Sequence, residues 1–228
     1  MATHQSLEGT PDEEFVQRIA SNHHERFGAD FWAMFTAEIA PMLPSQPIIV
    51  DLGCGPGLFL RDLGERHPQA TLFGYDVTPA MIAYGRQLPA TGAHTTLAIH
   101  DVATQPLPHD ANSVHLVTMT SVLHVLDEPL PVLAEIRRVL APGGLFLLHD
   151  WIRTPLPTYL AWRQERQGEA PHVSRQRGFR LFPAHCKYTT EDWQWLLDEA
   201  GFVIKHQDQL RPTHRLFVTA PAGPTRQR

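Results

Sequence analysis

The sequence predicts an α/β fold with a mostly parallel sheet, helices on both of its faces and an antiparallel strand at its end. Between residues 48 and 151, short apolar runs alternate with segments of helical periodicity. The apolar runs are continuous, which is typical of parallel strands that are buried on both faces. Two further runs, 202–210 and 213–221, are joined by a short link at Pro212 that suits an antiparallel pair.

The expected elements follow one another in chain order. Strands are expected at residues 47–53, 70–77, 95–102, 113–123 and 141–151. Helices are expected at residues 12–28, 30–43, 57–68, 78–88, 129–140, 157–168 and 189–202. Thr78 is placed to cap its helix, with Pro79 as the first helical residue. Thr190 is expected to cap the last helix, which stops at Gly201.

These elements divide the chain into a core and two additions. Residues 45–151 and 189–222 are expected to form the core domain around the sheet. Residues 12–44 form an N-terminal helical cap. Residues 152–188 are rich in Pro, Arg and aromatic side chains and form a second cap inserted into the core. Residues 1–11 and the last six residues are polar and are expected to be disordered.

The composition argues against several classes of partner. The 228 residues carry a formal net charge of -5, whereas nucleic acids and anionic membranes usually require a basic face. The sequence has no run of 18 apolar residues and no apolar or basic leader, so neither a membrane span nor a signal peptide is expected. Its two cysteines match no disulfide or metal spacing. We expect a cytoplasmic protein that is a monomer or a homodimer.

A glycine-rich turn, "VDLGCGPG", follows the first expected strand. Its glycines are spaced G-x-G-x-G, and Leu58 stands where the dinucleotide fingerprint G-x-G-x-x-G has its third glycine. Pro56 also removes a backbone N–H that a pyrophosphate would need. Asp51, at the end of the strand, is unfavourable beside a pyrophosphate and favourable beside a cationic amino-acid group or a sulfonium. The turn therefore indicates a nucleoside that carries a cationic amino acid.

Two more acidic residues end the next two expected strands. Asp76 can accept hydrogen bonds from both hydroxyls of a ribose through its two carboxylate oxygens. Asp101 can accept one from an adenine amino group. Because ligands of open α/β sheets bind outside the carboxyl ends of the strands, Asp51, Asp76 and Asp101 are expected to line one crevice.

Four segments extend this pattern over residues 45–150: "VDLGCGPG", "GYDVTPAMIAYGR", "HDVATQPLP" and "LAEIRRVLAPGGLFLLHDW". Together they resemble the successive motifs of the class I S-adenosylmethionine-dependent methyltransferases. The resemblance implies a Rossmann-like sheet of seven strands with the last strand antiparallel, in agreement with the expected hairpin. It also implies S-adenosylmethionine as the cofactor and S-adenosylhomocysteine as the product.

The resemblance further implies a set of cofactor contacts. The glycine turn would surround the amino-acid end, and the helix after it would start close beneath. The ends of the second and third strands would hold the ribose and the adenine, and the end of the fourth would lie beside the methionine part. The implied residues are Asp51, Gly53, Gly55, Gly57, Asp76, Val77, Met81, Asp101, Val102, Thr120 and Ser121. For Val77 and Met81, core packing is the alternative.

Candidates for catalysis are few, because such a cofactor already carries an activated methyl group. The protein must hold a nucleophile in line with it and, in some reactions, take a proton. His124 follows the fourth strand, and a histidine suits the deprotonation of a hydroxyl or an amine. Asp150, at the end of the fifth strand, can orient a substrate amine or pair with a histidine. The alternatives are structural: a histidine that closes the loop and an aspartate that caps the strand.

The two caps supply candidate substrate contacts. Both are aromatic and the second is basic, so an aromatic or acidic acceptor would fit beneath them. The candidates are Trp32, Trp151, Tyr159, Arg180 and Tyr188. The basic residues of the second cap are Arg153, Arg163, Arg166, Arg175, Arg177, Arg180 and Lys187. The alternatives are aromatic side chains that pack on each other and arginines that form a solvated face.

Histidine is frequent, with 14 residues, but the pattern gives no metal signature. No pair stands four residues apart on a helix with a third ligand nearby, so no functional metal site is expected.

The sequence therefore favours an enzyme of small-molecule biosynthesis that methylates an oxygen or nitrogen of a small, aromatic or acidic metabolite. An RNA or protein methyltransferase is the first alternative. It has support from the basic stretch "RQRGFR" and is opposed by the net negative charge. A cofactor-binding regulatory subunit without activity is the second alternative, and the complete set of strand-end aspartates speaks against it.

Overall fold

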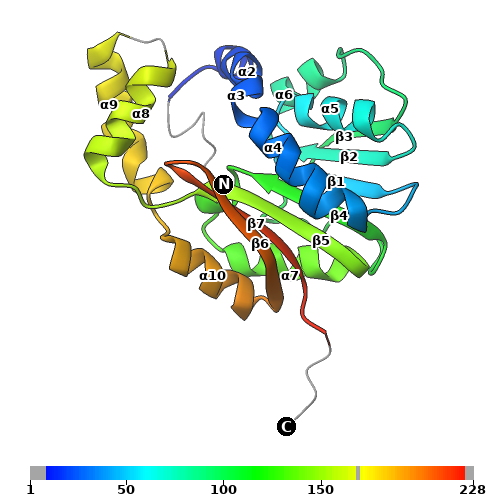
Figure 1. Ribbon diagram of the computed structural model, residues 1–228. Coiled ribbons are helices and arrows are strands. Elements are labelled where there is room, and N and C mark those ends of the chain that lie inside the picture. The colour runs from blue at the N-terminus through cyan, green and yellow to red at the C-terminus, as the bar shows by residue number, and fades with distance from the viewer. Residues whose placement is uncertain (1–8, 168–169, 224–228) are drawn as a thin grey trace.

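Residues 9–167 and 170–223 are described by the computed structural model, and their strands form one seven-stranded sheet (Figure 1). The strand order is β3-β2-β1-β4-β5-β7-β6. The strands are β1 (Ile48–Leu52), β2 (Thr71–Asp76), β3 (His94–Ile99), β4 (Val114–Thr120), β5 (Leu140–Trp151), β6 (Phe202–Arg211) and β7 (His214–Pro221). The prediction of an α/β fold with a mostly parallel, seven-stranded sheet is confirmed.

The antiparallel part of the sheet is its C-terminal hairpin. β1 to β5 pair with one another in parallel, and β7 lies between β5 and β6 and runs antiparallel to both. Only Pro212 and Thr213 separate β6 from β7, which is too short for a parallel crossover. The predicted hairpin at the end of the sheet is therefore confirmed.

Helices cover both faces of the sheet (Figure 1). One face carries α4 (Ala29–Met34), α5 (Leu58–Arg66) and α6 (Pro79–Gly85), and the other carries α7 (Pro129–Val139) and α10 (Thr190–Glu199). Successive residues of a strand point to opposite faces, so each strand feeds both cores. In β1, for example, Ile49 joins the cluster with α4 and α5, and Val50 joins the cluster with α7 and α10.

The N-terminal cap consists of short helices instead of the two expected. Residues 12–28 contain α2 (Asp12–Ser21) and α3 (His23–Arg26), and α4 continues through a π-helical turn at Phe35–Ile39 and a 3-10 turn at Ala40–Met42. Phe15 and Val16 of α2 pack against Met81 of α6. The cap is therefore attached to the helix that follows the second strand.

The inserted cap is a pair of helices, α8 (Leu156–Gln167) and α9 (Pro171–His185). The sequence predicts α8, whereas α9 corrects the expectation of a single helix in this segment. Pro183 and Gly178 lower the intrinsic helix propensity of α9, but Pro171 is favourable in its first turn. Packing against α8 and the end of β5 therefore outweighs local propensity.

Two helix caps differ in detail from expectation. Thr189, not Thr190, caps α10: its Oγ1 accepts from the Asp192 N–H at 3.1 Å, and Asp192 Oδ2 accepts from the Thr189 N–H at 2.7 Å. Thr78 stands at the N-cap of α6 but makes no side-chain capping hydrogen bond.

The predicted disordered ends fall mostly on residues 1–8 and 224–228, which lie outside the described residues. Within the described ranges, no helix combines the length and apolar character needed to cross a membrane.

Candidate cofactor and acceptor site

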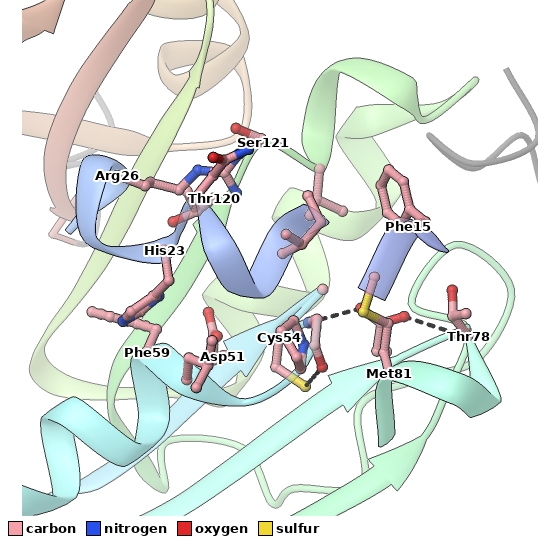
Figure 2. Close-up of a pocket in the computed structure, with 18 of the residues that line it drawn as sticks. Phe15, His23, Arg26, Asp51, Cys54, Phe59, Thr78, Met81, Thr120 and Ser121 are labelled. Carbon is pink, nitrogen blue, oxygen red and sulfur yellow. Dashed lines mark hydrogen bonds between the residues drawn. The ribbon is translucent and has the colours of Figure 1, made fainter. Parts of the chain in front are cut away.

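One pocket lies at the carboxyl ends of β1, β2, β4 and β5, where helices α2 and α3 line its other side (Figure 2). The position of α3 is fixed from the core side. His23 Nε2 lies 2.7 Å from Asp62 Oδ2 of α5, and the Phe27 ring stacks on Phe59 at 4.4 Å between centroids. The N-terminal cap therefore forms a wall of this pocket.

The glycine turn after β1 is held against the end of β2. The backbone N–H groups of Gly53 and Cys54 both donate to the Tyr75 carbonyl, at 2.7 and 3.0 Å. Gly53 has φ +70°, and a Cβ there would lie 2.2 Å from a methyl carbon of Val122. Only glycine allows both this backbone conformation and this close approach.

Asp76 links the turn to the start of α6. Its Oδ2 accepts from the Gly55 N–H at 2.9 Å, and its Oδ1 accepts from the Thr78 N–H at 2.8 Å. Burial raises the pKa of this carboxyl, while the backbone donors act in the opposite direction. Since a carboxylate offers about four acceptor positions, each oxygen can still accept from a ribose hydroxyl.

Asp51 is buried beside the turn. Thr118, its neighbour across the β1–β4 pair, donates a hydrogen bond of 2.7 Å to Asp51 Oδ1. Burial raises the pKa of Asp51 from 3.8 to about 7, against the opposing effects of Thr118 and Arg26. A carboxyl with such a pKa is ready to ionise when a cation is placed next to it.

The end of β4 combines polar groups with a partly buried cation. Ser121 adopts φ 55° and its N–H donates to the His149 carbonyl at 2.9 Å. Thr120 Oγ1 is buried and has no hydrogen-bond partner within the described ranges. Figure 2 places Arg26 of α3 at this end of the pocket, and burial lowers the pKa of its guanidinium. This end can therefore bind carboxylate or hydroxyl oxygens.

His124 and Asp150 form a buried pair outside the pocket lining. His124 Nδ1 lies 2.6 Å from Asp150 Oδ1, and both side chains are fully buried. Asp150 also accepts from the backbone N–H groups of Leu123, His124 and Trp151, at 2.9, 3.3 and 2.7 Å. The pair thus joins the loop after β4 to the end of β5.

The other half of the pocket is aromatic and basic. Trp151 at the end of β5 stacks on His185 of α9, with 3.8 Å between ring centroids. Tyr159 Oη lies 2.8 Å from His185 Nδ1, which fixes the ring from behind. Trp162 and Arg163 of α8 complete this wall. The arrangement provides flat apolar surfaces, a cation and one imidazole.

Comparisons with known proteins agree with this geometry. Residues 50–148 match a family model described as a methyltransferase domain. A structure of an S-adenosylmethionine-dependent methyltransferase from Mesorhizobium loti superposes with a TM-score of 0.59 at 25% identity, covering 84% of this chain and 99% of that one. Residues 50–148 are therefore similar to a methyltransferase domain, and the chain has the fold of that S-adenosylmethionine-dependent methyltransferase.

Curated relatives of this chain are named as methyltransferases of particular acceptors. A trans-aconitate 2-methyltransferase from Methylobacterium nodulans is 30% identical over 145 residues, which cover 61% of this chain and 54% of that protein. A malonyl-[acyl-carrier protein] O-methyltransferase from Hahella chejuensis is 39% identical over 130 residues, covering 56% and 44%. The chain thus spans about half the length of these relatives.

Most of the residues predicted to bind a cofactor line the pocket. They are Asp51, Gly53, Gly55, Asp76, Val77, Met81, Val102, Thr120 and Ser121. Gly57 and Asp101 do not line it. Gly57, at φ +74°, precedes α5 and faces the side chain of Leu97. Asp101 Oδ1 accepts from the Ala103 N–H at 3.0 Å, and its neighbours His100 and Val102 line the pocket instead.

Most of the residues predicted to contact a substrate do not line the pocket. Trp151 lines the pocket, and Tyr159 is buried behind it and His185. Trp32 lies under the Arg66 guanidinium, 3.8 Å from ring to Cζ. Arg180 is exposed, and Tyr188 packs on Trp193.

Several pocket residues were not predicted for the site, namely Phe15, Ile19, Arg26, His185 and Arg211. No local pattern marks them. Arg26 stands in the polar run "HHER" and His185 in the irregular second cap, so only the packing of the caps on the sheet places them in the pocket.

No three His, Cys, Asp or Glu side chains among the described residues are arranged to hold a metal ion.

Proposed function

We propose that this protein transfers the methyl group of S-adenosylmethionine to an oxygen or nitrogen of a small, aromatic or acidic metabolite. The observation that carries the proposal is the two-part pocket. An acidic cradle at the glycine turn continues into a wall built from Trp151, Trp162, Arg163 and His185. Both caps close around it, which suits a small acceptor better than a polymer.

The cradle fits the chemistry of the cofactor. Asp51 would bind the ammonium group of the amino-acid end, and Asp76 would accept from the ribose hydroxyls. Thr120 Oγ1, which is buried without a partner in the described part of the chain, would bind beside the methionine part. Val77, Met81 and Val102 would contact the adenine. The assignments of Gly57 and Asp101 remain predictions. When bound, the cofactor supplies a methyl group activated by a sulfonium.

On the acceptor side, the geometry favours His185 over His124 as the group that takes a proton. His185 lines the pocket, whereas His124 lies outside the lining and is paired with Asp150. When His185 Nδ1 donates to Tyr159 Oη, its Nε2 carries the lone pair that can deprotonate a hydroxyl or an amine. Stacking on Trp151 keeps the ring in that orientation. His124 and Asp150 would then act as positioning residues that hold Trp151 in the pocket wall.

The names of the relatives support a small acceptor. Trans-aconitate is a small acid, and malonyl-[acyl-carrier protein] presents a small acidic acyl group on a carrier protein. Further relatives from Shouchella clausii and Geobacillus stearothermophilus are named demethylmenaquinone methyltransferases. A monomeric or homodimeric, cytoplasmic enzyme remains our prediction.

The proposal is tested by a metabolite screen that reads out S-adenosylhomocysteine release. We expect turnover with at least one small hydroxyl- or amine-bearing metabolite and none with total RNA or a denatured protein mixture. Turnover with RNA or protein alone would instead support an RNA or protein methyltransferase. Tight cofactor binding without any turnover would favour a regulatory subunit.

A further inference from the structure

Buried hydrogen-bond donors face the acceptor half of the pocket. Arg163 is 2% exposed, and its Nε and Nη2 have no hydrogen-bond partner among residues 9–167 and 170–223. Trp151 is 5% exposed, and its indole Nε1 likewise has none there. Both residues line the pocket. Because folded proteins pair nearly all buried donors, these groups indicate that a ligand supplies acceptor oxygens.

The chemistry of Arg163 narrows the ligand to an anion. A guanidinium is always charged, and a buried charge without a partner is strongly unfavourable until an opposite charge binds to it. The ring centroid of Tyr159 lies 6.0 Å from Arg163 Cζ, and such a contact compensates only part of the lost hydration. Of the pocket's three acidic residues, Asp51 and Asp76 belong to the cofactor cradle and bond to other groups, and Glu25 belongs to α3.

The geometry of Arg163 fits a carboxylate. Nε and Nη2 form the edge of the guanidinium whose two N–H groups run parallel, which is the edge that pairs with both oxygens of a carboxylate. The side chain is also held in place. A Cβ at Gly178 of α9 would lie 3.6 Å from Arg163 Cδ and 2.5 Å from Leu160 Cδ2, so α8 and α9 pack closely here. A side chain held in this way is preorganised to bind.

We propose that the methyl acceptor carries a carboxylate, that Arg163 binds this group in a bidentate pair, and that Trp151 Nε1 donates to an oxygen of the same acceptor. The identification of the ligand as the acceptor rests on the proposed function. The aromatic rings of Trp151 and Trp162 exclude water from the pair and provide apolar surface for the body of the molecule.

Matched acid–amide pairs test the subsite without any methyl transfer. Benzoate, phenylacetate and hexanoate, each with its primary amide, are titrated calorimetrically into the full-length protein with and without S-adenosylhomocysteine. We expect at least one acid to bind more tightly than its amide. Arg163→Gln should weaken that acid by about tenfold or more and leave the amide unchanged. Arg175→Gln, which changes an exposed arginine of α9 over Phe179, is the matched control and should retain the selectivity.

Thermal unfolding separates a binding role of Arg163 from a structural one. Without ligand, Arg163→Gln should unfold at the same or a higher temperature than the wild type, because it removes an unpaired buried charge. Arg163→Lys keeps the charge but lacks the two parallel N–H groups, so its affinity for the acid should lie between those of the wild type and Arg163→Gln. A lower unfolding temperature together with unchanged acid selectivity would refute the subsite.

The subsite and the proposed function fail in different ways. A wild type that prefers no acid over its amide, while it binds S-adenosylhomocysteine and methylates a neutral acceptor, contradicts the subsite alone. Acid selectivity that depends on Arg163 in a protein that binds no S-adenosylhomocysteine supports the subsite and contradicts the proposed function.

Discussion

Replacing Asp150 by Asn tests the structural importance of the buried pair with His124. Its two carboxylate oxygens accept from three backbone N–H groups, and Oδ1 also lies 2.6 Å from His124 Nδ1. An amide has the same shape but replaces one oxygen by an NH2 group. If the NH2 group replaces Oδ1, it faces the Trp151 N–H and His124 Nδ1. If it replaces Oδ2, it faces the N–H groups of Leu123 and His124. In both cases at least one backbone N–H loses its acceptor.

The expected loss follows from these contacts. A hydrogen bond to a charged group contributes about 1.5–3 kcal/mol, so losing two should lower the free energy of unfolding by about 3–6 kcal/mol. At about 2–4 °C per kcal/mol for a chain of this size, the unfolding temperature should fall by about 10 °C. Urea titration followed by tryptophan fluorescence measures the free energy. Asp208→Asn, near the surface with one backbone partner, is the control and should change it by less than about 0.5 kcal/mol.

A loss below about 1 kcal/mol for Asp150→Asn would refute this reasoning, because it would show that the carboxylate is not the group that joins the β4 loop to β5.

The remaining predictions concern the cradle and the acceptor wall. Since the pKa of Asp51 in the folded protein is raised from 3.8 to about 7, its neutral form stabilises the fold at low pH, and this stabilisation is lost as the pH rises through about 7. A cationic ligand needs the ionised form, so S-adenosylmethionine affinity measured by calorimetry should rise about tenfold from pH 6 to pH 8, and a flat profile would contradict the assignment. Gly53→Ala should lower the free energy of unfolding by about 2–3 kcal/mol in urea titration through its clash with Val122, whereas Gly143→Ala, at φ +79° with no atom within 4 Å of its Cβ, should show only the smaller backbone strain. His185→Gln should reduce kcat about 100-fold with little change in KM for the cofactor, and full activity would remove His185 as the base.

The sequence allows the fold and the cofactor half of the site to be predicted, because both depend on local patterns. Continuous apolar runs mark the buried parallel strands, and Asp51 and Asp76 each stand where a strand ends. Every α/β sheet of this kind gathers its strand ends at one edge, so the residues come together whatever the loops do. Asp101 shows where this prediction from strand ends fails. A local turn directs its carboxylate to the Ala103 N–H instead of into the pocket.

The acceptor half could not be predicted, because it depends on how the caps pack. Arg163 and Arg180 belong to the same basic segment, yet one is buried in the pocket wall and the other is exposed. The difference arises from the packing of α9. This helix could not be predicted from helix propensity, because it contains proline and glycine. His185 lies at the end of that helix, and it reaches the pocket only because α9 packs against α8 and Trp151.

Calorimetric titration of S-adenosylmethionine into the wild type and Asp76→Ala tests the central claim most directly. The two oxygens of Asp76 are expected to accept from the ribose hydroxyls in addition to Gly55 and Thr78. We predict one bound molecule per chain in the wild type and an affinity about 100-fold weaker in Asp76→Ala, from the loss of hydrogen bonds to a charged group. No binding to the wild type, or equal binding by the two proteins, would contradict the account.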